Sequence, residues 1–216
     1  MPQPAKSKDD KFTYRDYLTW PDEERWELID GIAYDMTPAP SRNHQRLSAA
    51  LTSKLYNYLE DKDCEVYAAP FDVRMPRGNE NEIEIDTIVQ PDISVICDPE
   101  KLDEKGCLGA PDLIIEITSP STAKKDVIEK FNLYERVGVR EYWIVRPQEK
   151  TVTVFKLGKD KKYGRPDVYS AEDEIKVGIF EDLSIKLAEV FGEEKAEKEK
   201  ANNENETNKK QKIDKK

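Results

Sequence analysis

Two acidic residues stand in segments of the sequence that are otherwise apolar. Glu116 lies inside the run LIIEI at residues 113–117, and Asp92 lies between an Ile-Val pair at 88–89 and the run ISVI at 93–96. An ionised carboxylate inside such a strand costs several kcal/mol unless something compensates its charge. Two acids on adjacent strands can share one cation, and hard oxygen ligands suit Mg²⁺ or Mn²⁺. The sequence therefore predicts a divalent-metal site at Asp92 and Glu116.

The competing interpretation is that each acid pairs with an Arg or Lys for structural reasons, or lies on an exposed face. For either acid alone the two interpretations are about even. The two acids together, followed by a suitably placed lysine, favour the site.

That lysine is Lys130, in a helix expected over residues 123–137. The helix should run antiparallel to the strand that holds Glu116. At roughly 1.5 Å per helical residue and roughly 3.3 Å per strand residue, the Lys130 amine can reach the Glu116 carboxylate. Two alternatives remain: a surface pair between Lys130 and Asp126, which is worth little, and Lys124, which lies nearer the middle of the apolar helix face.

The elements around these residues indicate an α/β fold with a mixed central β-sheet flanked by helices. Residues 112–118 and 141–145 read as strands joined by the helix over 123–137, and such a crossover makes the two strands parallel. Apolar residues at helical spacing predict a long amphipathic helix over 43–59. Asp30-Gly31 predicts a tight hairpin turn between two short strands, residues 65–75 and 83–97 read as further strands, and a short helix is expected over 12–20.

Composition divides the chain into three parts. Residues 1–11 are polar and read as a flexible N-terminus, residues 12–192 form one domain, and residues 193–216 read as a disordered charged tail. The tail holds eight Lys and seven acidic residues, a net charge of +1. Because the whole chain has a formal net charge of −10, the remaining residues together carry −11. An acidic body argues against broad, non-specific coating of nucleic acid, but not against an enzyme that reaches phosphate through bound metal.

No segment has the apolar length of a membrane span, and residues 1–11 lack the apolar stretch of a signal peptide, so we expect a cytoplasmic protein without membrane contact. The three cysteines, Cys64, Cys97 and Cys107, are odd in number and read as reduced thiols rather than a disulfide framework or zinc site.

An ordered series of these motifs resembles the Uma-two family of restriction-endonuclease-like proteins, within the PD-(D/E)XK nuclease superfamily. The series spans roughly residues 12–190, and its most specific part is the spacing from Ser119 through Lys130 to Trp143. It comprises WELIDG at 26–31, His44, QPD at 90–92, PDLIIEI at 111–117 with SPST at 119–122, Asp126, Lys130, Tyr134 and GVREYWIV at 138–145.

The resemblance implies a Mg²⁺- or Mn²⁺-dependent endonuclease acting on nucleic acid, with DNA as the expected substrate. Asp92 and Glu116 match the superfamily's metal-binding acids. The superfamily lysine expected two positions after Glu116 is replaced by Thr118, and Lys130 matches the lysine that this family carries on the following helix. Glu27 matches an acid near the N-terminus of the fold that binds a second metal or a metal-bound water. The alternative, that Glu27 is an ordinary exposed residue of a strand, is about as good an interpretation.

Three other residues are weaker candidates. His44 opens the long helix and is a candidate for substrate contact, although a cap or surface role is favoured for a lone histidine. Asp112 reads as structural, or at most as supporting the site, and Asp86 is an outside candidate.

Two rival functions remain. One is a catalytically inactive nuclease fold that serves as a binding or regulatory module. The other is a hydrolase with His44 as base, which suffers because no Ser or Cys stands in a nucleophile-elbow context. Strand edges and apolar segments such as residues 141–145 would also support a homodimer, which suits cutting of both DNA strands.

Overall fold

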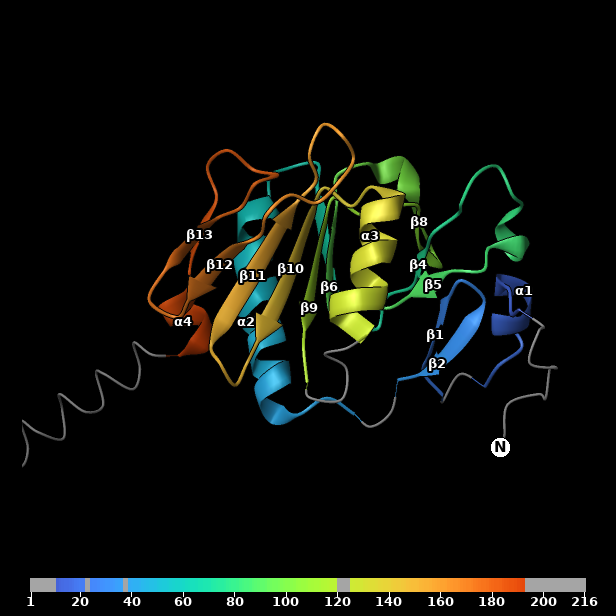
Figure 1. The fold of residues 1–216 in the computed structure, drawn as a ribbon, viewed down its shortest axis with the longest axis horizontal. Coiled ribbons are helices and arrows are strands. Elements are labelled where there is room, and N and C mark those ends of the chain that lie inside the picture. The colour runs from blue at the N-terminus through green and yellow to red at the C-terminus, as the bar shows by residue number, and fades with distance from the viewer. Residues whose placement is uncertain (1–10, 22–23, 37–38, 120–124, 193–216) are drawn as a thin grey trace, which may run out of the picture.

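The structure is a computed structural model that describes residues 11–21, 24–36, 39–119 and 125–192. A six-stranded sheet, called here the central sheet, runs through it (Figure 1). Within this sheet only the pairing of β9 with β10 is parallel, as the predicted crossover requires. Its other pairings are antiparallel, so the expected mixed sheet is confirmed. In spatial order its strands are β12 (Asp167–Ser170), β11 (Thr151–Lys156), β10 (Glu141–Arg146), β9 (Leu113–Ile117), β6 (Ile93–Ile96) and β3 (Glu65–Ala68).

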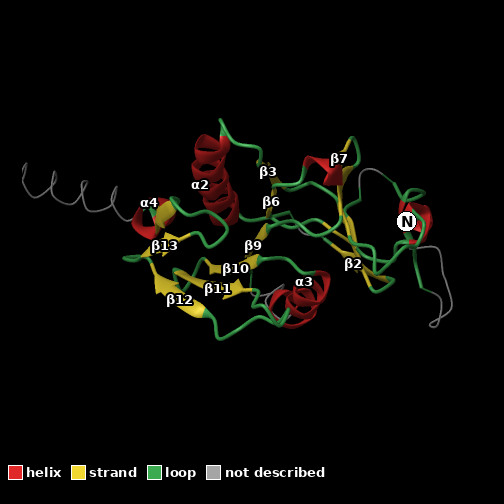
Figure 2. Cartoon of the chain, turned by 90° about the horizontal axis from the view of Figure 1, so that it is seen from above, coloured by secondary structure: helices red, strands yellow, loops and turns green. Residues whose placement is uncertain are grey.

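Helices cover both faces of the central sheet. Seen from above, α2 (Arg42–Leu59) and α3 (Phe131–Val137) lie on opposite sides of it (Figure 2). Buried leucines at every fourth position of α2 pack with alternate residues of β9, whose remaining apolar residue, Ile114, packs with the α3 side. This two-sided burial explains why β9 is apolar along its whole length.

Local signals in the sequence place several element ends correctly. Ser41 caps α2 by accepting a hydrogen bond from the backbone N–H of His44. Gly138 ends α3 in the left-handed conformation. Asp30 and Gly31 both have positive φ, 54° and 80°, as a tight hairpin turn between β1 (Trp26–Ile29) and β2 (Ile32–Asp35) requires.

A second six-stranded sheet was not predicted. Its strands, in spatial order, are β2, β1, β5 (Ile88–Val89), β4 (Val73–Arg74), β8 (Gly106–Leu108) and β7 (Leu102–Asp103). The segments 65–75 and 83–97, each expected to be one strand, are instead divided between the two sheets. Pro70 and Pro91 lie at the divisions, where a residue without an N–H cannot continue a strand ladder.

The remaining elements are short. They are α1 (Tyr14–Tyr17), α4 (Leu187–Phe191), the hairpin of β13 (Glu174–Lys176) and β14 (Ser184–Lys186), the 3₁₀ turns η1 (Glu82–Glu84) and η2 (Pro99–Lys101), and the π-helical turn η3 (Lys125–Lys130) that precedes α3. No helix within the described ranges is both long and apolar enough to cross a membrane.

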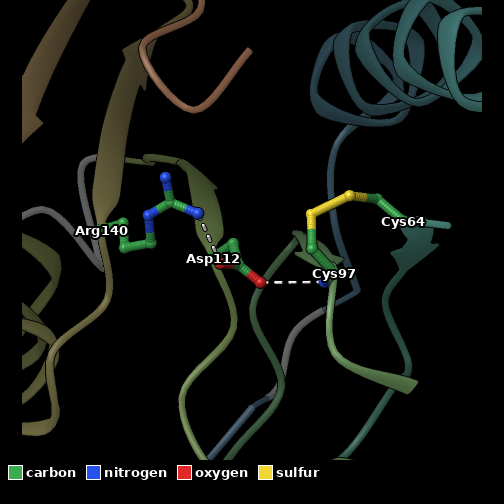
Figure 3. The surroundings of a disulfide bond; sticks show 4 residues. All are labelled: Cys64, Cys97, Asp112 and Arg140. Atoms are coloured by element: carbon green, nitrogen blue, oxygen red, sulfur yellow. Dashed lines mark hydrogen bonds and ion pairs between the residues drawn. A yellow bond between two sulfur atoms is a disulfide. The ribbon is translucent and has the colours of Figure 1, made fainter. Parts of the chain in front are cut away.

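The expectation of three reduced thiols is wrong. Cys64 and Cys97 form a disulfide between β3 and β6 (Figure 3). The antiparallel register pairs Glu65 with Ile96, so the next position brings the two cysteines opposite each other. A separation of 33 residues does not reveal this neighbourhood in the sequence. Cys107 is buried and free.

Candidate active site

Asp92 and Glu116 come together on adjacent strands of the central sheet. The register of β6 and β9 pairs Ile93 with Ile115, and one further step places Asp92 opposite Glu116. Asp92 Oδ2 also accepts a hydrogen bond of 2.7 Å from the backbone N–H of Ile117. The carboxy-terminal end of β9, the amino-terminal end of α2 and the start of α3 lie at the same end of the molecule (Figure 1). The two acids therefore meet where three elements converge.

Lys130 reaches Glu116 as the helix arithmetic predicted. Lys130 Nζ lies 2.8 Å from Glu116 Oε1 and 2.8 Å from Glu27 Oε1. The lysine side chain is 2% exposed, and the two glutamate side chains are 6% and 0% exposed. A single buried ammonium group is thus held between carboxylates from the two different sheets.

Glu27 is a buried residue of β1, so its interpretation as an exposed strand residue is wrong. Its Oε1 accepts a hydrogen bond of 3.0 Å from the backbone N–H of Gln90 and faces Lys130. The contacts of Glu27 connect it to the lysine of the site.

His44 lies in the first turn of α2 and contacts the site. Its Nε2 lies 3.0 Å from Asp92 Oδ2, and its Nδ1 is buried without a partner among the described residues. Because a carboxylate oxygen can only accept, we assign a proton to Nε2, which donates to Asp92. The N-cap of the helix is Ser41, and the His44 side chain is 14% exposed, so the ring lies against Asp92 rather than on the surface.

Tyr134 stands in the series of motifs that resembles the family, but the sequence analysis gave it no role; in the structure it contacts Glu116. Its hydroxyl donates a hydrogen bond of 2.7 Å to Glu116 Oε1, the same oxygen that Lys130 contacts. Burial, together with the nearby charges of Glu116 and Glu27, raises the pKa of Tyr134 well above its ordinary value. The spacing of four residues after Lys130 was the available signal, since it places both side chains on one helix face.

Gln90, named in the sequence analysis only as part of the QPD motif, joins the site to a polar network between α1 and the second sheet. Its side chain donates to Asp72 Oδ1 (2.8 Å) and to the Tyr17 hydroxyl (3.3 Å), and it accepts two hydrogen bonds from Arg25. Burial raises the pKa of Asp72 above its ordinary value. Since the Gln90 backbone holds Glu27, this network fixes the second sheet against the site.

The structure does not bring the other candidates to this cluster. Asp112 precedes β9, roughly 13 Å from Glu116 at about 3.3 Å per residue. Its carboxylate binds the Cys97 N–H (2.8 Å) and Arg140 (3.0 Å), beside the disulfide (Figure 3). Asp86 pairs with Arg77 instead. Lys124 lies outside the described residues.

The donor set fits a small hard cation that keeps much of its water. Within the described ranges, no three His, Cys, Asp or Glu residues form a group able to hold a metal ion. Mg²⁺ is commonly bound by one or two carboxylates with water and substrate phosphate completing its shell. The Asp92 side chain is 19% exposed, which leaves it accessible from solvent. Asp92 and Glu116 are the two carboxylates of the cluster that could serve as ligands of such an ion.

Comparison with known proteins identifies relatives of this chain. The family model Uma2, described as "Putative restriction endonuclease", matches residues 14–188. The protein slr1290 of Synechocystis sp. (strain ATCC 27184 / PCC 6803 / Kazusa), described as uncharacterized, is 31% identical over 126 residues, which are 57% of this chain and 62% of that protein. The match thus spans less than two thirds of that relative.

A solved structure shares the fold. The crystal structure of "a putative nuclease belonging to DUF820" from Anabaena variabilis ATCC 29413 superposes with a TM-score of 0.67 at 21% identity, covering 84% of this chain and 98% of that chain. This likeness supports the restriction-endonuclease-like fold predicted from the sequence. The family match covers most of the chain, and we conclude that the protein belongs to the Uma2 family of restriction-endonuclease-like proteins.

Proposed function

We propose that this protein is a divalent-metal-dependent endonuclease that hydrolyses phosphodiester bonds, with DNA as its substrate. The observation that carries the proposal is the placement of Asp92 opposite Glu116, with the buried Lys130 in contact with Glu116. The family description as restriction endonucleases supports the choice of nucleic acid as substrate.

Asp92 and Glu116 would hold Mg²⁺ or Mn²⁺. When bound, such an ion polarises a phosphate oxygen and lowers the pKa of an attacking water. His44 donates to Asp92 and so fixes the orientation of that carboxylate. The Asp92 carboxylate also accepts a hydrogen bond from the Ile117 N–H, which further restricts its rotation.

Lys130 would supply positive charge beside the scissile phosphate, where negative charge increases in the transition state. Glu27 holds the ammonium group from the side of the second sheet. We therefore propose that Glu27 positions Lys130, in preference to binding a second metal ion. This role explains why a fully buried acid stands in β1.

The test is cleavage of supercoiled plasmid DNA in Mg²⁺ or Mn²⁺ by the wild-type protein and by D92N, E116Q and K130M. Each of these variants should lose metal-dependent cleavage while remaining folded by circular dichroism. The matched control is D112N, which removes a carboxylate at the other end of β9 and should cleave like the wild type. Full activity of folded E116Q protein would refute the assignment.

The rival function, a nuclease fold that binds without turnover, makes a different prediction. It expects no cleavage of DNA or RNA by the wild type, and no Mn²⁺ binding that depends on Asp92 and Glu116. Isothermal titration with Mn²⁺ alone separates the two.

A further inference from the structure

We propose that Tyr134 is a positioning residue that fixes the Glu116 carboxylate for metal binding. The inference rests on the proposed function, because it assigns Glu116 to a divalent cation. It goes beyond that function by adding a residue that touches neither metal nor substrate.

Tyr134 and Lys130 hold the same oxygen from the same helical segment. The Tyr134 hydroxyl lies 2.7 Å from Glu116 Oε1, and Lys130 Nζ lies 2.8 Å from it. Two donors that converge on one oxygen restrict rotation of the carboxylate about its last bond. The orientation of Glu116 is therefore set from α3 as well as from β9.

The tyrosine ring is itself fixed by packing. Tyr134 is fully buried and belongs to the core cluster on the α3 side of the central sheet. Its ring meets Tyr142 edge to face, with the centroids 4.9 Å apart and the planes at 75°. The hydroxyl cannot leave Glu116 without disturbing this packing, so it offers a preorganised hydrogen bond.

The hydroxyl of Tyr134 is fully buried and donates its hydrogen bond to Glu116 Oε1. This geometry assigns Tyr134 the positioning of that carboxylate.

Loss of this hydrogen bond has a predictable effect on metal binding. Carboxylates that ligate metals are oriented by hydrogen bonds from surrounding residues, and removing such a partner typically costs about 10–100-fold in metal affinity. Y134F keeps the ring and deletes only the oxygen. We therefore expect the Mn²⁺ dissociation constant of Y134F to rise by about 10–100-fold.

A purely structural role for the hydroxyl would lower stability without changing metal affinity. Tyr163 provides the matched control, because its buried hydroxyl donates a hydrogen bond of 2.9 Å to the Val139 carbonyl in the same aromatic cluster. Y163F loses a comparable hydrogen bond that does not reach the site. It should lower the melting temperature and leave Mn²⁺ affinity unchanged.

The experiment is isothermal titration with Mn²⁺ of the full-length wild type, Y134F, Y163F and E116Q, with thermal unfolding of each. Weakened binding by Y134F alone among the two tyrosine variants supports the proposal. Unchanged Mn²⁺ affinity in folded Y134F overturns it, even if its melting temperature falls. If the wild type binds no Mn²⁺, or if E116Q binds it equally well, the proposed function itself fails. That result is distinct from a failure of the Tyr134 proposal.

A measurement on the wild type covers the case in which Y134F does not fold. Tyrosines labelled with ¹³C at the ring carbon that bears the hydroxyl are followed by NMR during titration with Mg²⁺. A shift of the Tyr134 ring-carbon resonance on addition of Mg²⁺ supports the proposal. A Tyr134 resonance that stays unmoved at saturating Mg²⁺ overturns it.

Discussion

Replacing Lys130 with methionine tests the electrostatic account of the site through stability alone. The substitution keeps an apolar stem and removes the ammonium group that lies 2.8 Å from both Glu27 Oε1 and Glu116 Oε1. At an effective dielectric constant of about 20, each contact corresponds to about 6 kcal/mol of Coulomb attraction. The cost of burying the ammonium group offsets much of this sum, and removal of one partner of a buried pair typically costs about 3–5 kcal/mol.

We therefore expect K130M to lose about 3–5 kcal/mol of unfolding free energy at pH 7, a large part of the stability of a typical domain. The assay is urea unfolding followed by tryptophan fluorescence, in the presence of a chelator. The matched control is K162M, whose amine pairs with Glu135 of α3 but is 68% exposed. An exposed pair contributes about 0–1 kcal/mol, so K162M should lose little.

The double variant E27Q/K130M tests whether unpaired charge is the cause. It removes one of the two acids that K130M leaves without their cation, and it should be more stable than K130M. The reasoning is refuted if K130M loses no more stability than K162M, or if E27Q gives no recovery.

Three further predictions concern other parts of the fold. The hydrogen bond from the buried Arg74 guanidinium to Asp103 holds the pKa of that carboxyl below its ordinary value. The stabilisation by this hydrogen bond is therefore present above the unfolded pKa of about 3.9 and is lost as the pH falls through the lower folded pKa. In urea unfolding, the stability difference between wild type and D103N should shrink below about pH 4. A difference that does not depend on pH would contradict this. Reduction of the Cys64–Cys97 disulfide, which spans 33 residues, should lower the unfolding free energy by about 3–4 kcal/mol through chain entropy, and equal stability of the oxidised and reduced proteins would count against that estimate. Burial raises the pKa of Cys107 to about 11, so iodoacetamide should label two thiols in the reduced native protein and leave Cys107 unlabelled; rapid labelling of Cys107 would contradict its burial.

Features with local causes were predictable from the sequence. The turn at Asp30-Gly31 follows from the two positive φ angles that this dipeptide tolerates. The helix over 42–59 follows from its apolar spacing. The contact between Lys130 and Glu116 followed from the fixed rise of helices and strands, since both residues belong to one crossover unit.

Features that depend on tertiary contacts were not predictable. The second sheet includes strands of only two residues, β4 and β5, which are too short to show alternation in the sequence. The burial of Glu27 depends on that sheet. The disulfide depends on the register of β3 with β6, and the role of Tyr134 depends on the direction of its hydroxyl within a packed core.

The most direct test of the central claim is a crystal of the wild-type protein soaked in Mn²⁺, with anomalous diffraction measured at a wavelength where manganese scatters strongly. The account predicts one anomalous peak in contact with carboxylate oxygens of both Asp92 and Glu116. A fully soaked crystal without a peak there, in which Glu116 is held by Lys130 and Asp92 by His44 alone, would contradict it.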